Sequence, residues 1–102
     1  MTTQPRKSFD QINYNTTARI CINTVCINLH VPGSKGLEAA DILQSAGIIA
    51  DSVPNAKALA AATVYLATNK KYDEKQLAES LRCDKNTITH YIEELSDTLG
   101  NI

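Results

Sequence analysis

The chain has 102 residues, with 10 Lys and Arg against 11 Asp and Glu, and a formal net charge of −1. That length suits a single domain. With 43% hydrophobic and 21% charged residues, the composition is that of a globular protein and not of a disordered one. The near-zero charge excludes a polybasic protein that coats nucleic acid by electrostatics alone.

Three cysteines, Cys21, Cys26 and Cys83, form an odd set without a CxxC pair. This argues against a disulfide framework and favours a reducing, intracellular compartment. The first fifteen residues lack the apolar segment of a signal peptide. The apolar runs, such as Gly47 to Ala50, are far shorter than the roughly 20 residues that span a bilayer. We therefore expect no membrane segment.

Residues 1–16 are polar and are predicted to be a flexible arm, and residues 17–102 a single helical domain. The apolar residues of the arm, Phe9, Ile12 and Tyr14, could dock on the domain, a point that the sequence leaves open. From Thr17 a helical pattern begins, although its β-branched content would also suit a strand. Its apolar face is Ile22, Val25, Cys26 and Leu29.

Two further helices are predicted in the middle of the chain. The first runs from about Ser34 to Ala50, with an inward face of Leu37, Ala40, Leu43, Gly47 and Ala50. The second, residues 56–67, is rich in alanine, the best helix former, and is apolar around nearly its whole circumference. Such a helix is expected at the centre of a bundle, enclosed by its neighbours.

The last two helices are predicted from their capping residues. Asp73 with Gln76 approximates a capping box for a short helix whose inward face is Leu77, Ala78 and Leu81. Asp84 is expected to cap the final helix, and Gly100 follows that helix as a C-cap. Its apolar positions are Ile88, Tyr91, Ile92, Leu95 and Leu99. The fold class is therefore an all-α bundle of five helices.

Residues 76–92 have the spacing of a helix-turn-helix, with Cys83 as the apolar residue of the turn. The first turns of the second helix in such a unit reach base edges in the major groove. We expect Asn86 to pair with adenine, Thr89 to contact a thymine methyl group, and Lys85 or His90 to reach phosphate. The candidate DNA-binding residues are Lys85, Asn86, Thr87, Thr89 and His90, with the basic loop residues Lys70, Lys71 and Lys75.

A structural reading of the same segment stays open, because helix-turn-helix geometry is also a packing solution. Glu93, Glu94 and Asp97 make the rest of the last helix acidic, and phosphate repels acidic side chains. A purely structural unit is therefore the alternative to DNA contact.

Four segments together resemble a cyclin-fold repeat: residues 29–32, 39–43, 59–67 and 76–95. The resemblance is to the second, C-terminal repeat of the transcription factor IIB family, including the archaeal transcription factor B proteins, and it covers roughly residues 17–100. Its most specific part is the alanine-rich helix ending in Tyr65-Leu66-Ala67, followed at family spacing by Thr87-Ile88 and Tyr91.

The resemblance implies five helices around a central third helix and a role in transcription initiation or its regulation, through promoter DNA and TATA-binding protein. It also implies the cytoplasm of an archaeal cell or the nucleus of a eukaryotic one. Thr89 stands where the family has the arginine that contacts the promoter element upstream of the TATA box, and Ala56 replaces a usual proline. The family's zinc ribbon and first repeat have no counterpart, so an excised C-terminal domain or a single-repeat protein is expected.

Other kinds of site receive little support from the sequence. Cys26 and His30 are four residues apart, but tetrahedral zinc needs two more ligands at metal spacing. No oxyanion loop or carboxylate partner accompanies His90, so we expect neither an enzyme nor a cofactor. The alternatives to a factor IIB type of domain are a protein-binding cyclin-fold adaptor and an unrelated helix-turn-helix regulator.

Overall fold

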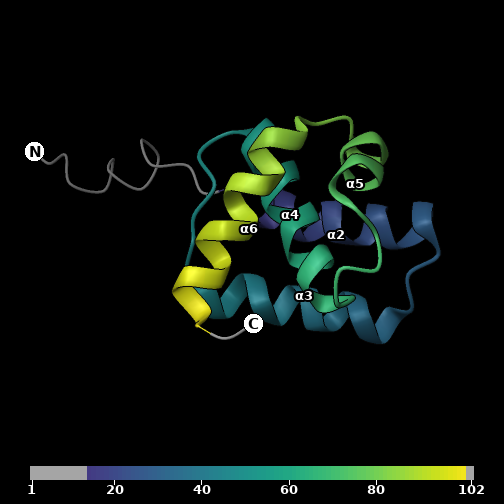
Figure 1. Cartoon of the computed structure of the whole chain (residues 1–102), viewed down its shortest axis with the longest axis horizontal. Coiled ribbons are helices and arrows are strands. Elements are labelled where there is room, and N and C mark those ends of the chain that lie inside the picture. Colours follow the sequence, from purple (N-terminus) through teal and green to yellow (C-terminus); the bar gives the residue numbers. More distant parts are fainter. Residues whose placement is uncertain (1–13, 101–102) are drawn as a thin grey trace, which may run out of the picture.

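The alanine-rich helix α4 (Val53–Ala67) lies at the centre of the fold, as predicted (Figure 1). The structure is a computed structural model and describes residues 14–100. The described part of the chain is all-α and contains five helices. The other four are α2 (Asn15–Leu29), α3 (Gly33–Ala46), α5 (Glu74–Leu81) and α6 (Lys85–Leu99).

The four outer helices form a closed ring around α4. Helix α4 contacts all four of them, whereas each outer helix contacts only its two neighbours in the ring and α4. The order around the ring is α2, α3, α6, α5, and then α2 again. The pair α2 and α3 therefore lies on the side of α4 opposite to the pair α5 and α6.

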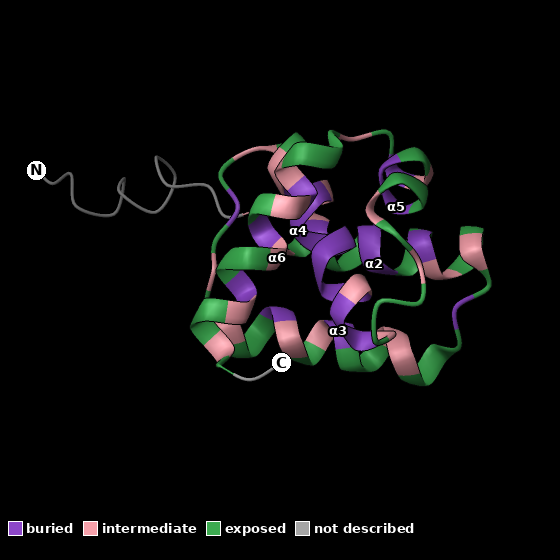
Figure 2. Cartoon of the chain, viewed as in Figure 1, coloured by how far each residue is buried: buried purple, intermediate pink, exposed green. Residues whose placement is uncertain are grey.

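Helix α4 is buried over nearly its whole length (Figure 2). Most of its buried residues are alanines, whose small side chains let the neighbouring helices come close. Ser52 caps its first turn by accepting a hydrogen bond from the Asn55 N–H at 3.2 Å. The buried Thr63 hydroxyl donates to the Ala60 carbonyl at 2.7 Å, so this polar group is satisfied inside the helix. The buried residues of α4 are Ala56, Ala58, Leu59, Ala60, Ala61, Ala62, Thr63, Val64, Leu66 and Ala67.

The first described helix begins at Asn15, two residues before the predicted start at Thr17. The Tyr14 N–H donates to the Ala50 carbonyl at 3.2 Å, and the Asn15 side chain bonds the Ile48 carbonyl and the Ala50 N–H. Residues 14–16 of the predicted arm are thus part of the domain. Residues 1–13 lie outside the described part of the chain.

Helix α2 settles the choice between helix and strand in favour of helix. Ile22 and Val25 are buried as predicted, together with Ala18 and Cys21. The helix ends at Leu29, and His30 follows it in the left-handed conformation with φ of 56°.

The inward face predicted for α3 is correct at Leu43 and wrong at Leu37. The helix ends at Ala46 because Gly47 adopts φ of 68°, a conformation that favours glycine. Ala39 and Leu43 are the buried residues of the helix, which is therefore rotated about its axis relative to the prediction. Leu37, predicted to be inward, is 71% exposed, and Ala50 is buried only after the helix has ended.

The predicted caps of α5 and α6 are confirmed. Asp73 accepts from the Gln76 N–H at 2.8 Å, and the Gln76 side chain accepts from the Asp73 N–H at 3.1 Å, which completes the capping box. Asp84 caps α6, and Gly100 follows its last residue. Within residues 14–100, no helix is long and apolar enough to cross a membrane.

Close packing around α4 makes a prediction for its alanines. Ala61 is fully buried, so replacing it with leucine inserts methyl groups where neighbouring helices already touch. We expect Ala61→Leu to lower the free energy of unfolding by about 1–3 kcal/mol, measured by urea denaturation. The control is Ala46→Leu, at a half-exposed position at the end of α3, for which we expect a smaller effect. Equal stability of Ala61→Leu and the unmodified chain would contradict close packing.

Candidate nucleic-acid interface

The turn between α5 and α6 is tight and fixed by backbone hydrogen bonds. Arg82 ends α5 in the left-handed conformation with φ of 55°, and its N–H donates to the Ala78 carbonyl. The Cys83 N–H donates to the same carbonyl at 3.0 Å. The left-handed conformation is costly for a residue other than glycine. The two hydrogen bonds to the Ala78 carbonyl hold the turn, and α5 packs on α6, so together they fix where α6 begins.

Asp84 fixes the first turn of α6 through Thr87. One carboxylate oxygen, Oδ2, accepts from both the N–H and the hydroxyl of Thr87, each at 3.0 Å. Thr87 is half-buried. Its hydroxyl is therefore engaged by the cap and helps to position the helix, and a contact of Thr87 with DNA stays a prediction.

The exposed side chains at the start of α6 are Lys85, Asn86 and His90. The His90 Nε2 lies 3.5 Å from the Glu94 carboxylate, and its ring meets the Tyr91 ring edge to face at 5.5 Å. Thr89 is half-buried, and its hydroxyl donates to the Lys85 carbonyl at 3.2 Å. Its methyl group remains the part of Thr89 that could meet a thymine methyl.

The predicted basic loop lies at the other end of α4. Lys70 and Lys71 follow the C-terminus of α4, where Lys70 has φ of 64° and its N–H donates to the Tyr65 carbonyl at 2.8 Å. The Lys71 ammonium lies 5.6 Å from the centre of the Tyr72 ring. All three lysines of this group, which includes Lys75 in the first turn of α5, are exposed.

Electrostatic effects on the α5–α6 turn and on α6 place the start of α6 near the start of α4 instead. Lys57, in the early part of α4, acts on the Cys83 thiol in the α5–α6 turn. Burial, then the carboxylates of Asp51 and Glu94, raise the pKa of Tyr91 on α6. From Lys57 to the end of α4 is about 15 Å at the rise of an α-helix. The structure therefore separates the lysine loop from Lys85 and Asn86.

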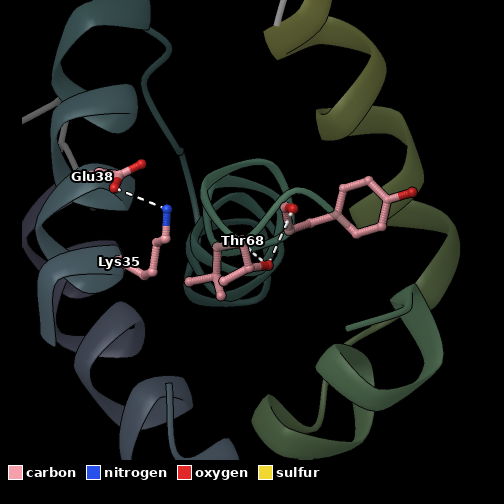
Figure 3. Close-up of polar contacts among 5 residues, drawn as sticks. Lys35, Glu38 and Thr68 are labelled. Carbon is pink, nitrogen blue, oxygen red and sulfur yellow. Dashed lines mark hydrogen bonds and ion pairs between the residues drawn. The ribbon is translucent and has the colours of Figure 1, made fainter. Parts of the chain in front are cut away.

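Figures 1 and 3 agree with this separation of the lysine loop from the start of α6. In Figure 1, α6 begins at the top of the view, and α4 ends towards the bottom. Figure 3 looks along α4, with Thr68 at its C-terminal end and the Lys35–Glu38 ion pair (3.2 Å) on α3 to the side. The Thr68 hydroxyl donates to the carbonyls of Val64 and Tyr65 at 2.8 and 3.3 Å and closes the helix end.

Two basic residues near the start of α6 were missed by sequence reasoning. Arg82 is exposed in the turn, immediately before the Asp84 cap, and Lys57 is half-exposed on α4. Arg82 ends α5 at a position where glycine usually adopts the left-handed conformation. Its place in the turn is the feature of the sequence that could have indicated Arg82 as a site residue. Nothing in the spacing of Lys57 indicates that it lies near a turn 26 positions later in the chain.

Burial raises the pKa of the Cys83 thiol from its ordinary value of 9.0 to about 11. The Lys57 ammonium opposes this shift, and Cys21 and Asp84 add to it. The thiol is thus protonated at neutral pH and serves as an apolar packing group in the turn.

Metal binding receives no support from the described residues. The helix that carries the half-buried Cys26 ends at Leu29, and His30 follows as its left-handed cap. No group of three or more His, Cys, Asp or Glu side chains within residues 14–100 is arranged to hold an ion.

Comparisons of the chain with protein-family models, curated proteins and solved structures find no match.

The raised pKa of Cys83 leads to a prediction for its reactivity. Because the thiolate is the nucleophile, we expect iodoacetamide to modify Cys83 in the folded chain about a hundredfold more slowly at pH 8 than in the urea-unfolded chain. Peptide mass spectrometry measures the two rates. Equal rates of Cys83 modification in the folded and unfolded chain would contradict the raised pKa.

The unfolded thiol ionises first as pH rises, so the free energy of unfolding should fall between pH 9 and 11. Cys83→Ser should reduce the loss of the free energy of unfolding between pH 9 and 11.

Proposed function

We propose that the chain is a DNA-binding domain that acts in transcription initiation or its regulation, and that the start of α6 enters the major groove of promoter DNA. The observation that supports this most directly is the group of exposed residues Lys85, Asn86 and His90 at the start of a helix that a tight turn and the Asp84 cap hold in place. A helix presented in this way is how helix-turn-helix proteins read base edges.

The charge along α6 favours one orientation on DNA. The first turn carries the partial positive charge of a helix N-terminus, with Lys85 on it and Arg82 beside it. Further along, Glu93, Glu94 and Asp97 are exposed and acidic. Phosphate therefore attracts the first two turns and repels the last two, so α6 must approach the groove by its N-terminal end.

Specificity in this proposal comes from few side chains. The Asn86 amide can make two hydrogen bonds to adenine, and the Thr89 methyl group can meet the methyl group of thymine. Lys85 and Arg82 hold phosphates. Because the net charge is −1, the isolated domain binds weakly. A partner supplies the remaining affinity, and the factor IIB resemblance indicates TATA-binding protein for that role.

A protein-binding adaptor is the second candidate. The exposed acidic residues Glu93, Glu94 and Asp97 on α6 favour it, because they suit a basic protein surface better than a phosphate backbone. In that case TATA-binding protein or a polymerase subunit would be retrieved by the chain without DNA. Retrieval that is lost on nuclease treatment would support the DNA-binding proposal instead.

The DNA-binding proposal predicts the effect of a charge change at the start of α6. Lys85→Ala should weaken binding to duplexes of every sequence and reduce the slope of log Kd against log salt by about one. Fluorescence anisotropy at several salt concentrations measures both quantities. Lys35→Ala is the matched control, since it removes the same charge from α3. Equal weakening by both variants would contradict a specific role for Lys85.

The same experiment decides the role of the distant lysine loop. Lys71→Ala leaves the first turn of α6 intact, so any weakening that it causes reports a second contact with the phosphate backbone. We expect a smaller effect than that of Lys85→Ala.

Asn86 carries the prediction about sequence. Asn86→Ala should relax the base preference of the domain at one position by about 1–3 kcal/mol, with little change in the salt dependence. Selection from a pool of random duplexes, followed by sequencing, measures the preference. An unchanged preference in the variant would show that Asn86 does not contact bases.

A further inference from the structure

A groove runs between α2 and α3, which lie across α4 from α5 and α6. It consists of two hollows, of about 380 and 280 Å³. The hollows meet where Arg19 on α2 lies across the groove from Ala40 on α3, because both residues line both hollows. Among the described residues, Arg19 is the only charged side chain that lines either hollow.

Exposed apolar side chains gather on this side of the molecule. Of the large apolar side chains exposed within residues 14–100, Ile20 and Ile27 lie on α2 and Leu37 on α3. Ile49 follows α3, and Val53 is the first residue of α4. Leu37 and Ile49 line the hollows and are 71% and 62% exposed. None of these side chains is on α5 or α6, and an apolar patch of this kind is typical of a surface that another molecule covers.

The charged residues of α2 and α3 are of opposite sign and are left without partners in the single chain. Lys35 and Glu38 form an ion pair at 3.2 Å within α3. The other charged residues of these two helices, Arg19 and Asp41, are exposed and form no ion pair within residues 14–100. Asp41 follows Ala40, so it lies at the level of Arg19 along the groove.

A second copy of the chain is the occupant that these two charges fit. A two-fold axis parallel to the groove places α2 of each copy against α3 of the other. Arg19 of each copy then meets Asp41 of the other, and the exposed apolar side chains of the two faces cover one another. A strongly acidic partner would attract Arg19 but repel Asp41, and a strongly basic partner would do the reverse. The balance of charge therefore favours a self-complementary contact.

We propose that the chain forms a symmetric dimer through the groove between α2 and α3, with Arg19 of each copy paired with Asp41 of the other and Leu37 buried in the contact. Helices α2 and α3 supply most of the contact, so we expect a weak dimer, with a Kd of the order of 10–100 μM. Because α5 and α6 lie across α4 from the groove, the dimer leaves the start of each α6 free. The inference does not rest on DNA binding.

Sedimentation equilibrium of the full chain tests the proposal between about 5 μM and 1 mM. We expect the mean mass to rise with concentration from 11.1 kDa towards twice that value. Leu37→Asp should weaken the dimer about tenfold, because it places a carboxylate in an apolar contact. A mass that stays at that of the monomer over the whole range overturns the proposal.

Charge reversal identifies the residues in contact. Arg19→Asp brings two acidic groups together at both symmetric pairs, and Asp41→Arg brings two basic groups together there. Each variant alone should therefore dimerise about tenfold more weakly than the unmodified chain. An equimolar mixture of the two variants restores attraction at both pairs, so we expect the dimer to return. Mixing could not restore an ion pair formed within one copy.

Lys75→Asp is the matched control, because it reverses an exposed charge on α5, across α4 from the groove. We expect this variant to dimerise like the unmodified chain. Both charge reversals replace exposed side chains, so circular dichroism should show an unchanged helical fold. If either reversal alone leaves the dimer intact, the contact lies on another face and the proposal is overturned. A mixture of the two variants that stays monomeric also overturns it.

Discussion

Close approach of helices to α4 is the constraint on which the rest of the structure depends. The fully buried alanines at positions 58 and 60–62 let neighbouring helices come close to α4. Much of the volume of the core therefore comes from larger side chains of those helices, beside Leu59 and Val64 of α4 itself. Ile22, Leu43, Leu77 and Ile88 supply it from α2, α3, α5 and α6 respectively. A chain with few aromatic residues can build a dense core in this way, because four aliphatic faces meet around one thin helix.

The same helix determines which functional residues can act together. Its early part lies near the α5–α6 turn, as the interaction of Lys57 with Cys83 shows. Its far end carries the turn that exposes Lys70 and Lys71. Because an α-helix is stiff and rises by about 1.5 Å per residue, these lysines cannot move to the start of α6. A duplex that contacts both must span the length of α4, whereas Arg82 and Lys85 need only a local contact.

Helix ends and the central helix could be predicted from the sequence, because each follows from residues that are close in the chain. Asp73 with Gln76, Asp84 and the alanine run act within one or two turns.

The inward face of α3 could not be predicted in this way. Ala39 and Leu43 are buried and Leu37 is exposed. The local pattern of Leu37 and Ala40 does not reveal this, because contacts with other helices decide which face is buried. The DNA contacts of the candidate site stay a prediction. The structure shows that Lys85, Asn86 and His90 are exposed and that the Thr87 hydroxyl bonds Asp84, and Lys57 approaches the turn only through tertiary packing.

The ring arrangement decides how the start of α6 lies relative to the groove between α2 and α3, which consists of the hollows around Arg19 and Ala40. Helices α5 and α6 lie across α4 from α2 and α3, and neither α2 with α6 nor α3 with α5 is in contact. DNA held by the start of α6 therefore does not cover the groove between α2 and α3. Any influence of one surface on the other must pass through the packing of α4 or through the contacts between neighbouring helices of the ring.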